Sequence, residues 1–142
     1  MTEYGFRLTR IFDAPRERVW REWTEPEAFA DWFGGALEVP LSSVSMDVRE
    51  GGSWRLTMLA DRGEIHWKGE YLEVEEPERL VLTVSDRPGD ERELVTVLLT
   101  DLGDGRTEML LEQRGHMTPD QYERTEQGWG GFLDKVAARL AA

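Results

Sequence analysis

The sequence predicts a single α+β domain over residues 1–142, in which a curved antiparallel sheet of about seven strands wraps around a long C-terminal helix. Two short helices are expected after the first strand. One observation behind this prediction is the alternation of apolar and polar residues between residues 41 and 115, which glycine-containing turns interrupt. Another is the change to a helical spacing of apolar residues after residue 118.

The first predicted strand covers residues 6–12, where the apolar residues at positions 6, 8 and 12 share one face. Pro15 then favours the start of a helix, because proline suits the first helical position. We expect this helix to cover residues 15–23, with Val19 and Trp23 on its buried face.

A second short helix is expected directly afterwards. Thr24 and Glu27 have the spacing of a capping box, in which each side chain bonds a free backbone N–H at the start of a helix. Gly34 and Gly35 are expected to end this helix, because glycine readily adopts the backbone conformation found after a helix.

Six more strands are predicted, and turn residues separate them. Asp104-Gly105 is a strong hairpin signal, because a two-residue turn of the mirror-image type needs positive φ angles. Residues 87–90, Arg-Pro-Gly-Asp, predict another turn. Short connections of this kind join antiparallel neighbours. The predicted strands cover residues 42–49, 53–60, 64–75, 79–86, 92–101 and 106–115.

The C-terminal helix has a clear start. Thr118 is the expected N-cap, Pro119 occupies the first helical position, and Gln121 completes a capping box. A helix of about 23 residues follows, which corresponds to a length of roughly 35 Å. Since the predicted sheet is apolar on one side, this helix is expected to cover that side.

The facing sides of the predicted sheet and helix carry many aromatic residues. Bulky rings seldom fill a tapered space, so we expect a pocket for a small apolar or aromatic ligand, with Arg10, Tyr71 and Gln113 as polar groups that orient it. The alternative is that the aromatic residues simply pack the core. The residues expected to line the pocket are Arg10, Trp20, Trp32, Phe33, Trp54, Leu56, Met58, Trp67, Tyr71, Leu82, Val84, Val97, Leu99, Met109, Leu111, Gln113, Trp129, Phe132, Leu133 and Val136.

The charge balance excludes some classes of partner. The chain has 29 acidic and 17 basic residues, a net charge of −12. Such a charge opposes binding to nucleic acid and to anionic membrane surfaces. Membrane insertion is not expected, because no apolar stretch approaches the 18 or so residues that span a bilayer. With no cysteine and no leader-like N-terminus, we expect a cytoplasmic protein.

Candidate catalytic groups are few. His66 is expected on the polar face of its strand and His116 in the turn before the last helix, where solvent exposure or capping is the simpler role. Two histidines without cysteine do not indicate a metal site, and we expect no cofactor. An enzyme of cyclase or lyase type remains an alternative, with Arg10, Tyr71, Gln113 or His116 as acid and base in the same pocket.

Several segments together resemble the START-like SRPBCC superfamily, and more narrowly the branch named after the activator of heat-shock-protein-90 ATPase. The resemblance implies a helix-grip fold whose pocket takes lipids, sterols, polyketides or other apolar guests in relatives. It implies no catalytic motif. The segments that carry it are Arg10, Ala14–Trp20, Trp23–Pro26, Trp32-Phe33, Gly51-Gly52, Gly69-x-Tyr71, Glu76–Leu80 and Gly128-Trp129.

The branch name also implies a chaperone partner and a link to the stress response. The eukaryotic activator carries an additional N-terminal domain, for which this chain is expected to have no room. Apolar residues at Tyr4, Phe6 and 32–37 would suit a docking surface for a partner, a homodimer contact or the lid of the pocket. Binding of a small apolar ligand is the leading hypothesis, and a chaperone-associated role is the other alternative to enzymatic activity.

Overall fold

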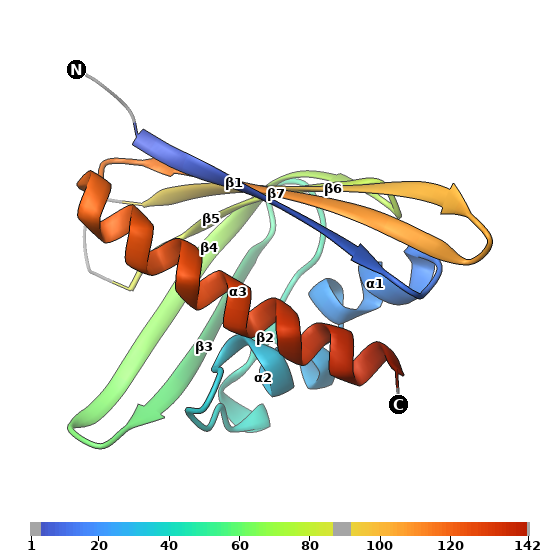
Figure 1. The fold of residues 1–142 in the computed structure, drawn as a ribbon. Coiled ribbons are helices and arrows are strands. Elements are labelled where there is room, and N and C mark those ends of the chain that lie inside the picture. The colour runs from blue at the N-terminus through green and yellow to red at the C-terminus, as the bar shows by residue number, and fades with distance from the viewer. Residues whose placement is uncertain (1–3, 87–91, 142) are drawn as a thin grey trace.

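The computed structural model describes residues 4–86 and 92–141, with Tyr4 described by its backbone alone. It confirms the predicted α+β class: one curved antiparallel sheet, two short helices and a long C-terminal helix (Figure 1). The predicted turn at residues 87–90 lies outside the described residues. The elements are β1 (Tyr4–Phe12), α1 (Arg16–Thr24), α2 (Pro26–Phe33), a 3-10 turn η1 (Leu41–Ser43), β2 (Ser45–Met46), β3 (Ser53–Ala60), β4 (Gly63–Glu75), β5 (Arg79–Val84), β6 (Glu93–Gly103), β7 (Arg106–Gly115) and α3 (Pro119–Ala141).

The strand order places the first strand beside the last. The sheet runs β1-β7-β6-β5-β4-β3-β2, and every neighbouring pair is antiparallel. Helix α3 crosses one side of this sheet from end to end (Figure 1). Helices α1 and α2 lie on the same side of the sheet, near the C-terminal half of α3. The β3–β4 hairpin diverges from the first half of α3 (Figure 1).

Two predicted local signals are confirmed. At the start of α3, the N–H of Gln121 donates to Thr118 Oγ1 at 3.2 Å, and the N–H of Thr118 donates to Gln121 Oε1 at 2.8 Å. This is the reciprocal capping box. In the β6–β7 hairpin, Asp104 and Gly105 have φ angles of 56° and 75°, as the mirror-image turn requires.

The predicted cap of the second helix is wrong. The N-cap of α2 is Glu25, and Pro26 occupies the first helical position. Thr24 ends α1 instead, and its hydroxyl donates to the carbonyl of Trp20 at 2.9 Å. Thr24 is the last residue of α1, one position before the residue that begins α2.

The predicted strand over residues 42–49 shortens to the two residues of β2. Leu41–Ser43 form the turn η1, and Ser43 Oγ donates to the carbonyl of Pro40 at 2.7 Å. The same hydroxyl accepts the N–H of Thr57 at 3.1 Å. A side chain therefore provides the partner that a longer β2 would have provided to β3.

The pairing of β4 with β5 is interrupted at Gly69. Tyr71 pairs with Leu82 and Lys68 with Ser85, and between these two pairs the indole N–H of Trp54 donates to the carbonyl of Thr83 at 3.0 Å. A Cβ at position 69 would collide with that carbonyl and with the Trp54 nitrogen. Glycine is required because a side chain crosses the strand at this point, in addition to any bend it permits.

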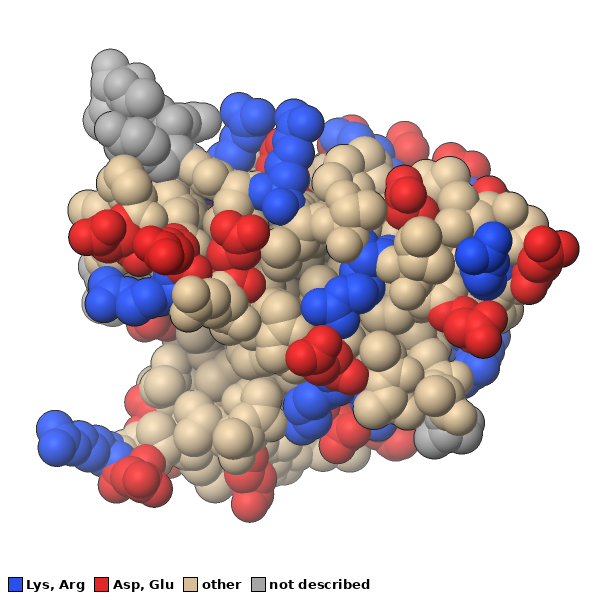
Figure 2. Space-filling view, viewed as in Figure 1, with Lys and Arg blue, Asp and Glu red and all other residues tan. Residues whose placement is uncertain are grey.

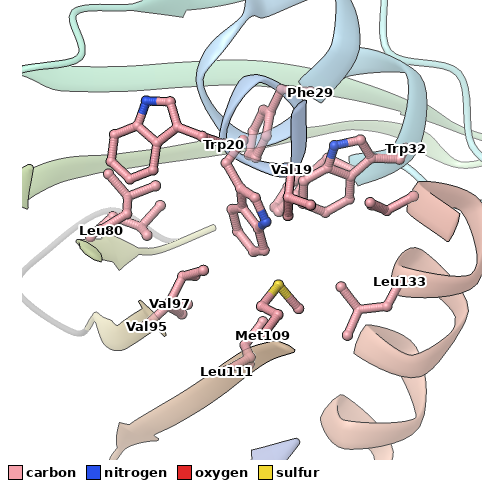
Figure 3. Close-up of a cluster of buried hydrophobic side chains, with 14 of the residues drawn as sticks. Val19, Trp20, Phe29, Trp32, Leu80, Val95, Val97, Met109, Leu111 and Leu133 are labelled. Carbon is pink, nitrogen blue, oxygen red and sulfur yellow. The ribbon is translucent and has the colours of Figure 1, made fainter. Parts of the chain in front are cut away.

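The core lies where α1, α2 and α3 meet the inner face of the sheet (Figure 3). Side chains from β5, β6 and β7 point toward the helices, and those of Val95, Met109, Leu111 and Leu133 are fully buried. Protein interiors of this kind are packed to about the density of organic crystals, with few voids.

Candidate functional site

A cavity of about 300 Å³ lies next to the core, between the sheet and the first half of α3. Figure 2 shows the surface hollowed on the side where the β3–β4 hairpin diverges from α3. This volume lies at the lower end of the range for ligand pockets, and an engineered cavity half as large binds benzene. The lining residues are Phe33, Trp67, Val84, Ser85, Asp86, Arg92, Glu93, Gln113, His116, Met117, Gln121, Thr125, Gly128, Trp129 and Phe132.

Four aromatic rings form the apolar wall of the cavity. Phe33 from α2 lies edge-on to Trp67 from β4, with their ring centroids 5.7 Å apart. Phe132 from α3 is 5.4 Å from Phe33 and 5.6 Å from Trp129. Behind this wall, Trp23 stacks on Trp129 at 5.7 Å. The rings thus support one another and present a rigid surface to the cavity.

Gln113 stands at the other end of the cavity and is almost fully buried. Its Oε1 accepts the indole N–H of Trp129 at 2.8 Å, and its Nε2 donates to Glu93 Oε1 at 3.2 Å. Since the two bonds use opposite ends of the amide, they fix its orientation. The aromatic wall and the polar end are therefore joined by hydrogen bonds.

Glu93 is the centre of this polar end. Besides Gln113, its carboxylate accepts the hydroxyl of Tyr122 at 2.6 Å and the backbone N–H of His116 at 3.1 Å. A Cβ on residue 115 would collide with the carboxylate, so Gly115 makes the room that it needs. Within the described part of the chain, no lysine or arginine forms an ion pair with Glu93.

The structure separates the predicted pocket residues into three groups. Those that line the cavity are Phe33, Trp67, Val84, Gln113, Trp129 and Phe132. Arg10 lies beside α3, where it pairs with Asp134 at 2.8 Å. The others belong to the packed core: Trp20, Trp32, Trp54, Leu56, Met58, Tyr71, Leu82, Val97, Leu99, Met109, Leu111, Leu133 and Val136.

Of the three polar residues expected to orient a ligand, the cavity contains Gln113 alone. Tyr71 is buried in the core, and its burial, together with the nearby charge of Asp47, raises the pKa of its hydroxyl well above the ordinary value. Arg10 is directed to the outer side of α3, where it also bonds the carbonyl of Gly130 at 3.5 Å.

Sequence reasoning missed Glu93 and Tyr122. A signal for Glu93 was present, because it occupies the inward position that Val95, Val97 and Leu99 continue along the same strand. A carboxylate at such a position needs partners. Tyr122, on the apolar face of α3, provides one of them.

The two histidines take no part in a cluster of metal ligands. His66 is exposed and lies 3.6 Å from Glu64, and His116 is exposed with its backbone bound to Glu93. The described residues include no group of three or more side chains suited to hold a metal ion. Among their helices, none is long and apolar enough to cross a bilayer.

Comparison with known families gives one match over most of the chain. The family model described as "Activator of Hsp90 ATPase homolog 1-like protein" matches residues 13–141. No protein with a curated description matches the chain.

Solved structures show the same fold. A protein from Chromobacterium violaceum is 29% identical, with a TM-score of 0.80 over 98% of this chain and 99% of that one. A protein from Nitrosomonas europaea is 28% identical, with a TM-score of 0.78 over 94% and 92% of the two chains. A protein from Silicibacter pomeroyi, described as AHSA1, is 25% identical, with a TM-score of 0.84 over 97% and 98%.

Proposed function

Because this chain belongs to the family of Activator of Hsp90 ATPase homolog 1-like proteins, whose members share this sheet and helix, we propose that it binds a small apolar or aromatic ligand between the sheet and α3. The observation that carries the proposal is the cavity of about 300 Å³ with an aromatic wall and one buried, oriented amide. Apolar walls with few convergent polar groups are typical of small-molecule sites.

The driving force is the transfer of apolar ligand surface out of water. Each Å² contributes about 25 cal/mol, before the costs of association are subtracted. The pocket walls are already held in place by ring contacts and by the bond between Trp129 and Gln113. A preformed site reduces the cost of ordering side chains on binding. We place this binding in the cytoplasm, in keeping with the charge and composition of the chain.

Two glycines of α3 allow a direct test. Gly128 lines the cavity, whereas Gly131 does not, and a Cβ on either would meet no atom within 4 Å. We expect Gly128→Leu to fill the pocket and weaken the binding of 2-naphthylmethanol at least about tenfold, measured by isothermal titration calorimetry. The same change at Gly131 should leave binding intact. Equal binding by both variants, or no binding by the unmodified protein, would contradict the proposal.

The arrangement favours binding over catalysis. Of the four residues considered as acid or base, Gln113 and His116 line the cavity, while Arg10 and Tyr71 lie away from it. A glutamine amide does not titrate, and no second titratable group of that set accompanies His116. A cyclase or lyase would therefore need other residues.

A chaperone-associated role is a second candidate, which the family description favours. A small apolar surface, Leu37, Leu41 and Leu59, is exposed where Glu38 pairs with Leu59. If this surface docks on an Hsp90-type ATPase, the protein should accelerate ATP hydrolysis by that enzyme, and the double variant Leu41→Ser, Leu59→Ser should reduce the effect. No stimulation by the unmodified protein would exclude this role.

A further inference from the structure

Among the residues that the structure describes, the carboxylate of Glu93 has neutral partners alone. Its three donors are the hydroxyl of Tyr122, the side-chain amide of Gln113 and the backbone N–H of His116. Half-buried carboxylates are costly unless a positive charge compensates them, and no cation of the described residues does so here. The side chain nevertheless lines the cavity, where a ligand would reach it.

Among the described residues that line the cavity, no lysine or arginine compensates the charge of Glu93. Arg92 lines the cavity, but its guanidinium is paired with Glu70 at 3.2 Å. His116 also lines the cavity, and it is exposed to solvent. The chain as a whole carries a net charge of −12, which attracts cations and repels anions.

The aromatic wall is suited to the same kind of ligand. Trp129 is joined through Gln113 to Glu93, so an indole ring lies close to the uncompensated carboxylate. The N–H edge of this indole is turned toward Gln113, and one of its faces is stacked on Trp23. An ammonium group at Glu93 would therefore meet the carboxylate, while the aromatic wall of the cavity would surround an apolar body attached to it.

We infer that the ligand of this pocket carries a protonated amine, and that Glu93 is its counter-ion. This inference rests on the proposed binding function, and it names the chemical class of the ligand. It excludes fatty acids and other carboxylates as preferred ligands, because they would place two negative charges together at the polar end.

Three probes with one naphthalene ring system separate this inference from the binding function itself. We expect 2-naphthylmethylamine to bind at least about tenfold more tightly than 2-naphthylmethanol at neutral pH, and 2-naphthoate to bind most weakly, in calorimetric titrations at one salt concentration. If the alcohol binds as tightly as the amine, the inference fails and the binding function stands. If none of the three binds, both fail.

A matched pair of variants assigns the preference to Glu93. Glu93→Gln keeps an acceptor for Tyr122 but removes the charge, so it should abolish the advantage of the amine over the alcohol. Glu108→Gln removes the same charge from the other face of β7, away from the cavity, and should keep the preference. Retention of the full preference by Glu93→Gln would overturn the assignment. Thermal melting of each variant checks that it is folded. If a variant does not fold, the comparison of the three probes on the unmodified protein still tests the inference.

Discussion

At the scale of single residues, two glycines leave space for neighbouring side chains. Gly115 leaves space for the Glu93 carboxylate, and Gly69 leaves space for the Trp54 indole where it reaches Thr83. Neither glycine has the positive φ angle that usually explains the residue. At Gly69 the nearby atoms include the backbone carbonyl of Thr83, so glycine is required there, whereas at Gly115 they belong to the flexible end of Glu93.

Position 69 provides a test of this reading. Gly69→Ala should lower the free energy of unfolding by about 1–3 kcal/mol, because the new methyl group collides with the Thr83 carbonyl and displaces the Trp54 indole. Urea denaturation followed by tryptophan fluorescence measures the change. As the control, Gly131→Ala meets no neighbour and should raise stability by about 0.5–1 kcal/mol, the usual gain in a helix. If both alanine variants change the free energy of unfolding equally, the contacts around Gly69 are not rigid and the explanation fails.

At the scale of elements, a cross-strand charge pair adds to the backbone pairing of β1 with β7. Arg7 is directly opposite Glu112, and its Nε donates to the carboxylate at 2.7 Å. This bond is the main cause of a lowered pKa of Glu112, and Arg114 adds to it. A carboxyl whose pKa is lower in the folded state stabilises the fold above its ordinary pKa, and the contribution is lost as the pH falls through the lowered value.

The lowered pKa of Glu112 predicts how the stability of the protein depends on pH. Glu112→Gln should destabilise the protein at pH 7 by less than about 1 kcal/mol, because Arg7 is largely exposed and solvent screens the pair. At about pH 3 the difference between the variant and the unmodified protein should shrink, since the carboxyl becomes protonated. Urea denaturation at both pH values measures this. A difference that grows on acidification would contradict the assignment of the ion pair.

Local signals in the sequence account for most elements. The capping box at Thr118 and the turn at Asp104-Gly105 act through neighbours in the chain, and both were predictable. The failure of the cap at Thr24 was not predictable, because its hydroxyl could bond either a free N–H of the next helix or the carbonyl of Trp20 in its own helix. β2 was overestimated for a related reason, since Ser43 bonds a strand 14 residues away.

For the whole molecule, the class of fold was predictable and the position of the pocket was only partly so. Periodicity identifies which residues point inward, and nearly all the predicted lining residues do point inward. It cannot tell which of them are packed and which face empty space. Met109 is packed in the core beneath helices α1 and α3. Gln113, four residues further along β7, lines the cavity because α3 diverges from β4 there.

The arrangement of β1 beside β7 has a consequence for biosynthesis. Tyr4 is paired with Gly115, and Phe12 with Thr107, so the edge of the sheet joins segments about a hundred residues apart. A nascent chain emerging from the ribosome cannot complete this edge until its final hairpin has been made. Until then β1 has no strand to pair with. Contacts between residues so far apart in the sequence are typical of slowly folding topologies.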